Sequence, residues 1–534
     1  MTTPEWQDRR RLLQWLSASA ATLYVPRSAW CQPRWASNPF TLGVASGSPT
    51  ADSVLLWTRL HVPGIPAAGL GAQPITVHWE LAHDDQFKHL VRRGQAIAPA
   101  ELAHSVHAEV AGLAPDRWYF YRFMTGDFVS PVGRTRTFPR PEAVVQRLRL
   151  GFASCQKWED GYFTAWRHMR QENLDLVMFL GDYLYEYPAK RSKLRTPPGG
   201  WLHTLDDYRQ RYALYKGDAD LQAMHASCPW LMTWDDHEVQ NDYAGVHAGH
   251  SAAKDPADPA HFLARRAAAY QAYYEHQPIR PAVLTQAMTG LLTGAEMRLY
   301  GQRPYGQLAS LYLLDTRQYK DLQVCTKEAT LGSGMVDPAR CPQWFEARRS
   351  LLGLEQERWL STQFAKPTSA RSSWTVLGQS TLLGQRDVKV GPGQRLWNDG
   401  WDGYPAARRR LTDALHQHAV PNPVVLGGDV HANWVGHVKA DYADANSASV
   451  GVEFCGTSIT SHAGDGARTA ELLAENPHFI FADALHRGYG VAEFTPAQLT
   501  TTLRVVDDVT HQDSQIDTLA RFAVQSGRPL VERV

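Results

Sequence analysis

The chain has 534 residues, of which 44% are hydrophobic and 20% are charged. This balance is too apolar for an intrinsically disordered chain and too polar for a protein with many membrane spans. The 54 Lys and Arg residues balance the 54 Asp and Glu residues, so no excess charge favours a stable complex with nucleic acid. We therefore expect a soluble globular protein, and its 22 His residues leave imidazoles available for catalysis or metal binding.

Residues 1–36 have the pattern of an export signal. Residues 8–11 are Asp-Arg-Arg-Arg, and an apolar, small-residue stretch that is too short to span a bilayer follows at 12–25. The arginines followed by leucines resemble the twin-arginine motif, with Asp8 where Ser or Thr is usual. The alternative is the start of a solvated basic helix. The motif predicts a periplasmic or secreted protein, exported already folded by the twin-arginine machinery, without a transmembrane anchor.

Residues 37–140 are predicted to form a β-sandwich, because short strands alternate with turn residues about every ten positions. The run 113–115, Leu-Ala-Pro, is followed by Tyr119 and Tyr121. This spacing resembles the signature of fibronectin type III domains, in which the first Tyr bonds back to the loop. Such a fold carries no chemistry of its own. Pro-Arg-Pro at 139–141 marks a linker to the second domain, residues 145–534.

In the second domain, strand-like and helix-like segments alternate, which predicts an α/β fold. Five apolar runs, each followed directly by polar side chains, are predicted to be buried strands. Ligands collect at the carboxyl ends of strands in α/β sheets, so we expect one convergent site. The runs are 148–153, 176–180, 230–234, 311–314 and 424–426.

The residues that follow these runs are typical metal ligands. Asp182 and Tyr185 are three apart in a turn, and Asp429 and His431 are two apart, so an extended backbone would place both on one side. A thiolate, a phenolate, a carboxylate and an imidazole together suit Fe³⁺, whereas oxygen donors alone suit Ca²⁺, Mg²⁺ or Mn²⁺. The candidate ligands are Cys155, Asp182, Tyr185, Asp236, Asn241, Asp429 and His431.

The order of three motifs, GDxxY at 181–185, DHE at 236–238 and GDxH at 428–431, is similar to the calcineurin-like metallophosphoesterases. Further motifs resemble one branch of these enzymes, the alkaline phosphatase D (PhoD) family, from about residue 40 to the carboxyl terminus. They are SCQ at 154–156, WDDHE at 234–238, LDTRQY at 314–319, WDGY at 401–404 and GDVHANW at 428–434.

The resemblance implies a four-layer αββα metallophosphoesterase domain after the fibronectin type III-like sandwich. It also implies one Fe³⁺ held by Cys155, Asp182, Tyr185 and His431, with Asp182 bridging to the first of two Ca²⁺ ions. Asp236, Asn241 and Asp429 would hold calcium. The sequence leaves open whether Asn241 or Asp242 is the outer ligand, and which carboxylate serves which calcium.

The implied activity is hydrolysis of phosphate mono- and diesters by attack of a metal-bound oxygen on phosphorus. His237 would stabilise or protonate the leaving oxygen, and Arg317 could form a bidentate pair with the phosphate. The expected partners are small-molecule phosphate esters, and a monomer is expected. A phospholipase D-type diesterase is one alternative, and a non-catalytic metal-containing binding protein is another.

Other residues have predicted structural roles. Cys325 and Cys341 flank a polar loop and are the one pair that could form a disulfide in an oxidising compartment. Cys455 is predicted to be core, and Glu453 could support the metal ligands. A solvated surface position is expected for His225, His247 and His250. A place in either a buried scaffold or a substrate pocket is expected for Asp315, Trp401, Tyr404 and Arg317.

Overall fold

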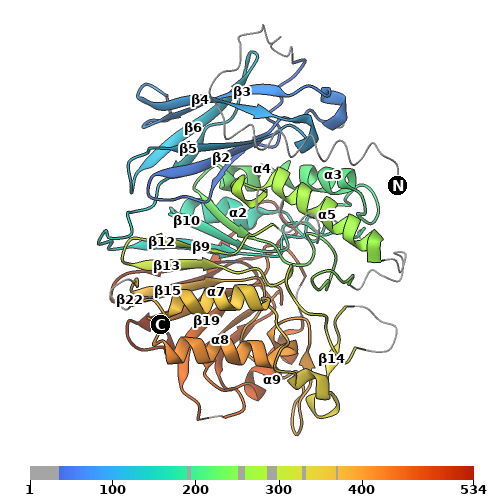
Figure 1. Ribbon diagram of the computed structural model, residues 1–534, viewed down its shortest axis with the longest axis vertical. Helices are drawn as coiled ribbons and strands as arrows, with labels where there is room; N and C mark the ends of the chain where they lie inside the picture. The colour runs from blue at the N-terminus through green and yellow to red at the C-terminus, as the bar shows by residue number, and fades with distance from the viewer. Residues whose placement is uncertain are drawn as a thin grey trace.

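The computed structural model describes residues 35–65, 67–188, 194–249, 259–284, 297–326, 332–367, 371–444, 446–462 and 464–534. Residues 1–34 of the predicted export signal lie outside this part of the chain. The described residues form a mixed α/β fold with several sheets (Figure 1). Among these described residues, no helix has the length and apolar character needed to cross a membrane.

The largest sheet has ten strands and combines both ends of the described chain. Its centre is parallel: β10 pairs with β9 on one side and with β11 on the other. The strand order is β24 (Val531–Arg533), β23 (Ile516–Gln525), β22 (Gln498–Val506), β21 (Arg487–Phe494), β9 (Leu148–Ala153), β10 (Leu176–Leu180), β11 (Trp230–Thr233), β1 (Val44–Gly47), β2 (Ser53–Arg59) and β5 (Ser105–Ala111).

A second sheet of seven strands packs against the first. The four strands β13, β15, β17 and β19 are parallel neighbours, and β12, β18 and β20 pair antiparallel. The order is β12 (Gly301–Tyr305), β13 (Ala309–Leu313), β15 (Trp374–Gly378), β17 (Pro423–Gly427), β19 (Ser449–Cys455), β18 (Asn433–Lys439) and β20 (Phe479–Asp483).

The side chains of β10 show how the layers form. Leu176, Met178 and Leu180 pack into a core shared with the seven-stranded sheet. Val177 and Phe179 alternate with them and point to the opposite core, which is shared with helices. A strand buried on both faces must be apolar throughout, which explains the continuous runs in the sequence.

Helices cover the outer faces of both sheets. The core beside the ten-stranded sheet contains side chains from α2 (Thr164–Met169), α3 (Leu205–Lys216), α4 (Ala219–His225) and α5 (Pro259–His276). The seven-stranded sheet packs on its outer face against α7 (Leu354–Phe364) and α8 (Pro405–Gln417). Helix α9 (Gly466–Glu475) packs near β18 and β20. Short 3₁₀ helices lie at Ala67–Leu70, Ala100–Leu102, Arg170–Glu172, Pro338–Arg340, Pro342–Phe345 and Trp401–Gly403.

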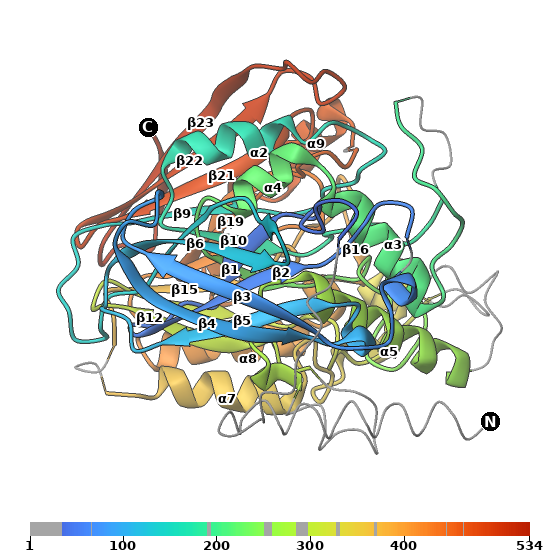
Figure 2. The same cartoon turned by 90° about the horizontal axis from the view of Figure 1, so that it is seen from above.

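The other strands of the N-terminal part form a separate, smaller sheet that crosses over β1, β2 and β5 (Figure 2). The hydroxyl of Tyr119 lies 3.0 Å from the amide nitrogen of Ala114, which is the corner contact that the fibronectin resemblance predicts. However, β1 pairs in parallel with β11, so β1, β2 and β5 continue the ten-stranded sheet. The small sheet contains β4 (Leu90–Ala98), β3 (Ile75–Ala82), β6 (Trp118–Thr125), β7 (Phe128–Val129) and β8 (Gly133–Arg136).

A two-stranded sheet of β14 (Met335–Val336) and β16 (Leu396–Trp397) lies at the side of the molecule. The predicted disulfide between Cys325 and Cys341 is present next to it. Cys155, Cys228 and Cys455 are free and buried.

Candidate metal centre and active site

The polar residues that follow β9, β10, β11 and β17 converge between the two sheets. Cys155, Asp182 and Asp429 each follow a strand and have left-handed backbone. Gly181 also has a positive φ, and a Cβ atom there would lie 2.5 Å from the Cβ of Asp235. Only glycine allows this close approach of the β10 and β11 ends.

The first group of donors is the inner cluster, which we define as Cys155, Asp182, Tyr185 and His431. The Cys155 sulfur, an Asp182 carboxylate oxygen and a His431 ring nitrogen lie within 4.8 Å of one another. The Tyr185 hydroxyl is 3.0 Å from Asp182 Oδ2 and 3.1 Å from His431 Nε2. His431 Nδ1 lies 2.9 Å from the carbonyl oxygen of His462, to which it donates a hydrogen bond. This leaves the Nε2 lone pair directed at the cluster.

The chemistry of the inner cluster fits a polyvalent cation. Burial, reinforced by the charge of Asp182, raises the pKa of the Cys155 thiol and that of the Tyr185 phenol well above their usual values. Burial also raises the pKa of Asp182, and Asp182 Oδ1 is buried with no hydrogen-bond partner among the described residues. A cation would favour the anionic forms of all three and satisfy that oxygen.

The second group is the outer cluster, which we define as Asp236, Asp242 and Asp399, whose carboxylate oxygens also lie within 4.8 Å of one another. The Asp242 amide donates to Asp236 Oδ2 at 2.7 Å. Asn241 is partly exposed, and its backbone N–H donates to Glu186 Oε1 at 2.9 Å. The carboxylate of Asp242, one of the two candidates left open by the sequence, lies in this cluster.

Asp399 is a member of the outer cluster that sequence reasoning missed. It lies in the loop after β16 and follows no strand of the parallel sheets. The available signal was its position two residues before the WDGY motif, in the turn-like run Asn-Asp-Gly at 398–400. Asp429, which was predicted, accepts a hydrogen bond from the Thr381 hydroxyl at 2.7 Å. Burial raises the pKa of Asp429, and the charges of Asp236 and Asp399 add to this rise while that of Arg317 opposes it.

Arg317 is buried among carboxylates. Its side chain is 2% exposed; Nε donates to Asp235, Nη1 is 2.6 Å from Asp399 Oδ2, and Nη2 is 3.5 Å from Asp236 Oδ2. The sequence analysis expects this guanidinium to pair with phosphate, and in the structure it contacts these three carboxylates. The geometry favours a role in neutralising and positioning carboxylates.

His237 lies beside both clusters. One of its ring nitrogens lies within 4.8 Å of carboxylate oxygens of Asp182 and Asp236, and its Nδ1 is 2.7 Å from Glu186 Oε2. Burial alone would lower the pKa of His237, but the charges of Glu186, Asp236 and Asp182 raise it well above the usual value. Glu186, the last residue of the GDYLYE run, is thus the partner that orients this imidazole.

One histidine prediction was wrong. His225 is 2% exposed rather than solvated, because its ring stacks on Trp230 with centroids 3.9 Å apart and bonds to the Tyr183 hydroxyl at 2.9 Å. His247 is exposed, as predicted. His250 lies outside the described residues.

The remaining candidates are buried. Cys455 is fully buried, as predicted. Glu453 accepts hydrogen bonds from the Leu383 and Gly384 amides at 2.6 and 2.8 Å, so its carboxylate holds a loop of the backbone. The other three side chains form scaffold contacts. Asp315 accepts from the amides of Arg317 and Gln318, Trp401 donates to Gln379, and Tyr404 donates to the carbonyl of Asp321.

Comparison with known families decides what kind of protein carries this site. The family model described as "PhoD-like phosphatase" matches residues 150–503, and "PhoD-like phosphatase, N-terminal domain" matches residues 26–139. The chain belongs to the PhoD-like phosphatases.

Individual members of this family agree. The chain is 43% identical over 513 residues to alkaline phosphatase D of Bacillus subtilis (strain 168), covering 94% of this chain and 83% of the relative. A solved structure titled "Structure of PhoD" matches with a TM-score of 0.86 and 43% identity, covering 94% of this chain and 93% of the other. This PhoD-like phosphatase is therefore a phosphoric ester hydrolase, and its buried acidic clusters could hold metal ions.

Proposed function

We propose that this PhoD-like phosphatase is an exported, metal-dependent alkaline phosphatase that hydrolyses both phosphate monoesters and diesters. The observation that carries the metal dependence is the inner cluster: a thiol, a phenol, a carboxyl group and an imidazole meet in a buried site, beside three more carboxylates. Simple packing does not require this combination.

In this proposal, Cys155, Asp182, Tyr185 and His431 hold Fe³⁺, because thiolate and phenolate donors suit a hard trivalent iron. Asp236 and Asp429, together with Asn241 or Asp242 and with Asp399, hold the two Ca²⁺ ions. When bound, these ions would neutralise phosphoryl charge and lower the pKa of water at the site. Two observations support the fit: the orphaned Asp182 Oδ1 and the spacing of the outer cluster.

The chain's own residues supply the remaining functions. The hydrogen bond from His237 Nδ1 to Glu186 fixes the orientation of the imidazole. The charge of Glu186 also favours the protonated ring, so His237 can donate a proton to the leaving oxygen of the ester. Arg317 holds Asp235, Asp236 and Asp399 in place through its buried ion pairs.

The fold and location follow the same proposal. The two packed sheets with their outer helices would be the four-layer metallophosphoesterase arrangement of residues 145–534, and residues 37–140 the fibronectin type III-like domain. Residues 1–36 would direct export of the folded protein. Changing the arginines at 9–11 to Lys in pairs should remove secreted or periplasmic activity; unchanged export would show that the segment is not a twin-arginine signal.

The test is hydrolysis of nitrophenyl phosphate and bis-nitrophenyl phosphate by the purified protein, before and after removal of calcium with a chelator. Both substrates should be hydrolysed, and chelation should abolish turnover until calcium is restored, because oxygen donors exchange Ca²⁺ readily. The protein should also be coloured, since phenolate bound to Fe³⁺ absorbs visible light, and Tyr185→Phe should shift or remove the band. Restoration by zinc and not by calcium would contradict the proposed metals.

A further inference from the structure

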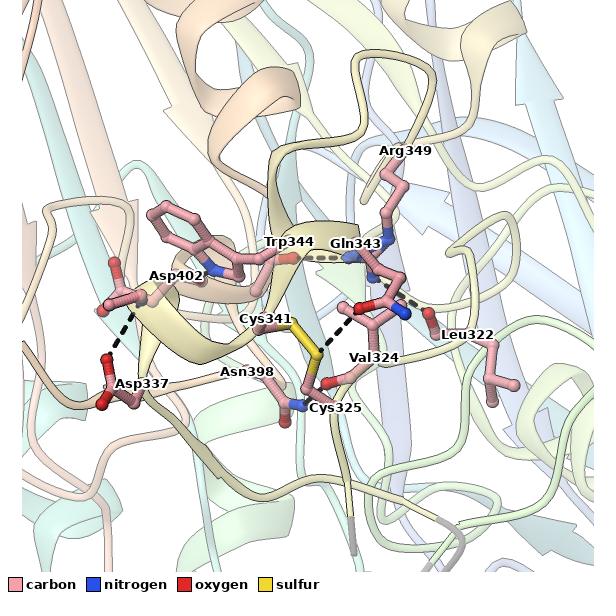
Figure 3. Close-up of a disulfide and its surroundings, with 12 residues drawn as sticks. Leu322, Val324, Cys325, Asp337, Cys341, Gln343, Trp344, Arg349, Asn398 and Asp402 are labelled. Atoms are coloured by element: carbon pink, nitrogen blue, oxygen red, sulfur yellow. Dashed lines mark hydrogen bonds between the residues drawn. A yellow bond between two sulfur atoms is a disulfide. The ribbon is translucent and has the colours of Figure 1, made fainter. Parts of the chain in front are cut away.

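The segment closed by the disulfide, residues 325–341, lies next to the outer cluster. The two cysteine Cα atoms are 6.0 Å apart (Figure 3). Cys341 packs in a small buried group with Val336, Trp344 and Leu396, whereas Cys325 is exposed. The bridge therefore ties a surface turn to a buried anchor. Of the residues between the two cysteines, Thr326 and 332–340 are described.

Residues inside the disulfide-closed segment bond directly to the outer cluster and its loop. The Ser333 hydroxyl donates to Asp242 Oδ2. The Gly334 amide donates to Asn398 Oδ1 at 2.7 Å, and the Gly334 carbonyl accepts from the Asn398 amide at 3.1 Å. Asn398 directly precedes Asp399, so the segment contacts Asp242 itself and the residue next to Asp399.

The chain that enters the segment makes a second set of contacts. Gln323 Nε2 donates to Asp399 Oδ1 and to the carbonyl oxygen of Asp242, both at 2.8 Å. The Val324 carbonyl accepts from Asn398 Nδ2 at 2.7 Å (Figure 3). One side chain, Gln323, thus links the two aspartates two residues before the bridged Cys325.

These donors oppose a repulsion within the cluster. Three carboxylates with oxygens within 4.8 Å of one another repel strongly when they are buried. Hydrogen bonds to charged carboxylates are among the stronger ones in proteins, and they also fix where each oxygen points. A loop that was free to move would lose the entropy of ordering each time these bonds formed, and a covalent bridge at its base reduces that loss.

We infer that the disulfide-closed segment is a positioning element for the outer cluster: the Cys325–Cys341 bridge holds Ser333 and Gln323 so that Asp242 and Asp399 present their oxygens at the spacing of a divalent-cation site. The inference rests on the proposed function, in which this cluster takes Ca²⁺. It adds that the cluster is fully organised only in the oxidised protein. Bridge formation removes two protons and two electrons from the thiols, and a disulfide-bearing oxidant receives them and becomes a dithiol.

The experiment compares full-length protein variants after calcium removal with a selective chelator. Cys325→Ser opens the bridge, and Cys228→Ser is the matched control, because Cys228 is a free cysteine in a different core. Calorimetric titration with Ca²⁺ alone should show binding weakened at least tenfold in the first variant and unchanged in the second. Dithiothreitol, which gives up two electrons and two protons as it closes to its cyclic disulfide, should weaken binding in the wild type in the same way.

A second pair of variants leaves the bridge intact. Ser333→Ala removes the hydroxyl that donates to Asp242 and should weaken Ca²⁺ binding about tenfold. Ser372→Ala is its control. Ser372 is also a buried serine, but its hydroxyl bonds at 3.1 Å to that of Ser310, which is not part of the outer cluster. This pair keeps the test valid if Cys325→Ser fails to fold.

Amide hydrogen exchange gives a readout that does not depend on any metal. Exchange at Asp242 and at 398–399 should be faster in Cys325→Ser and Ser333→Ala than in either control. Unchanged exchange in both would overturn the inference. Faster exchange with unchanged Ca²⁺ affinity would also overturn it as a statement about a cation site. Hydrolysis of nitrophenyl phosphate, measured in parallel on the wild type, reports separately whether the proposed function stands.

Discussion

Cys155, Asp182, Asp429 and His431 have φ angles of 58°, 58°, 68° and 55°. A non-glycine residue held in this left-handed region costs roughly 1–3 kcal/mol, so four such residues in one site represent substantial local strain. The left-handed conformation changes the direction of the chain after a strand. It thereby brings side chains from different strands to one point. Backbone bonds hold it in place, including the one from the Cys155 amide to the Gly181 carbonyl at 3.1 Å.

The inner cluster predicts a contrast between two buried cysteines. Cys155→Ser should lose bound iron and activity, because a hydroxyl is a poorer anionic donor than a thiol at neutral pH. Cys455→Ser should keep its iron, because Cys455 packs in a core cluster outside the inner cluster. The measurement is iron content per folded protein. Equal occupancy in the two variants would remove Cys155 from the set of ligands.

The buried ion pairs of Arg317 predict a loss of stability rather than a loss of substrate affinity. Arg317→Gln removes a counter-charge from three buried carboxylates, of which Asp399 keeps its ion pair with Lys320, and it should lower the free energy of unfolding by about 3–5 kcal/mol. Arg409→Gln is the control: its pairs with Asp413 and Asp441 are exposed and should be worth under about 1 kcal/mol. Urea denaturation measures both. Unchanged stability with a raised KM would instead support Arg317 as a phosphate ligand.

At the scale of elements, the sequence predicted which segments are strands better than it predicted how they pair. The runs at 148–153 and 176–180 match β9 and β10, because strands buried on both faces are continuously apolar. Only the resemblance, through its implied αββα layering, provided for two facing sheets; from the apolar runs alone, the separation of β10 and β17 was not predictable. Nor was Asp399, whose position depends on long-range contacts of a loop.

The Tyr119 corner gives a prediction at this scale. Tyr119→Phe removes the hydroxyl that bonds to the amide and carbonyl of Ala114. The free energy of unfolding should fall by about 1 kcal/mol, while hydrolysis of nitrophenyl phosphate stays unchanged, because Tyr119 lies in an apolar core separate from the clusters. Denaturant titration and a rate assay on the same sample measure the two effects. A fall in turnover at full folding would show that the corner influences the active site.

At the scale of the whole molecule, the N-terminal part of the chain, residues 37–140, is joined firmly to the rest. Strands β1, β2 and β5 extend the ten-stranded sheet beyond β11. Side chains on these strands also bond to helix α5 and the residues after it: Trp57 Nε1 donates to the Glu275 carbonyl at 3.1 Å, and His107 Nε2 lies 3.0 Å from that of Tyr274. The Trp57 contact is buried and the His107 contact is partly buried, so separating the two parts would expose polar groups and apolar surface together.

Deletion of residues 37–140 should therefore leave a protein that does not fold, because it exposes the edge of β11 and the apolar surface beside it. The full-length protein should unfold in a single calorimetric transition. Soluble yield and circular dichroism of the shortened chain check the first expectation. A shortened chain that still hydrolyses nitrophenyl phosphate would show that the two parts are independent.

The order of strands in the central sheet also limits when the protein can fold during its synthesis. Gly47 of β1 pairs with Trp230 of β11, and Phe152 of β9 pairs with Gly490 of β21. The middle of the sheet therefore has no partner on one side until nearly the whole chain has left the ribosome. Contacts between such distant residues form slowly and leave strand edges exposed in the meantime. We expect folding to finish only after translation ends, with chaperones protecting the early strands until the last ones arrive.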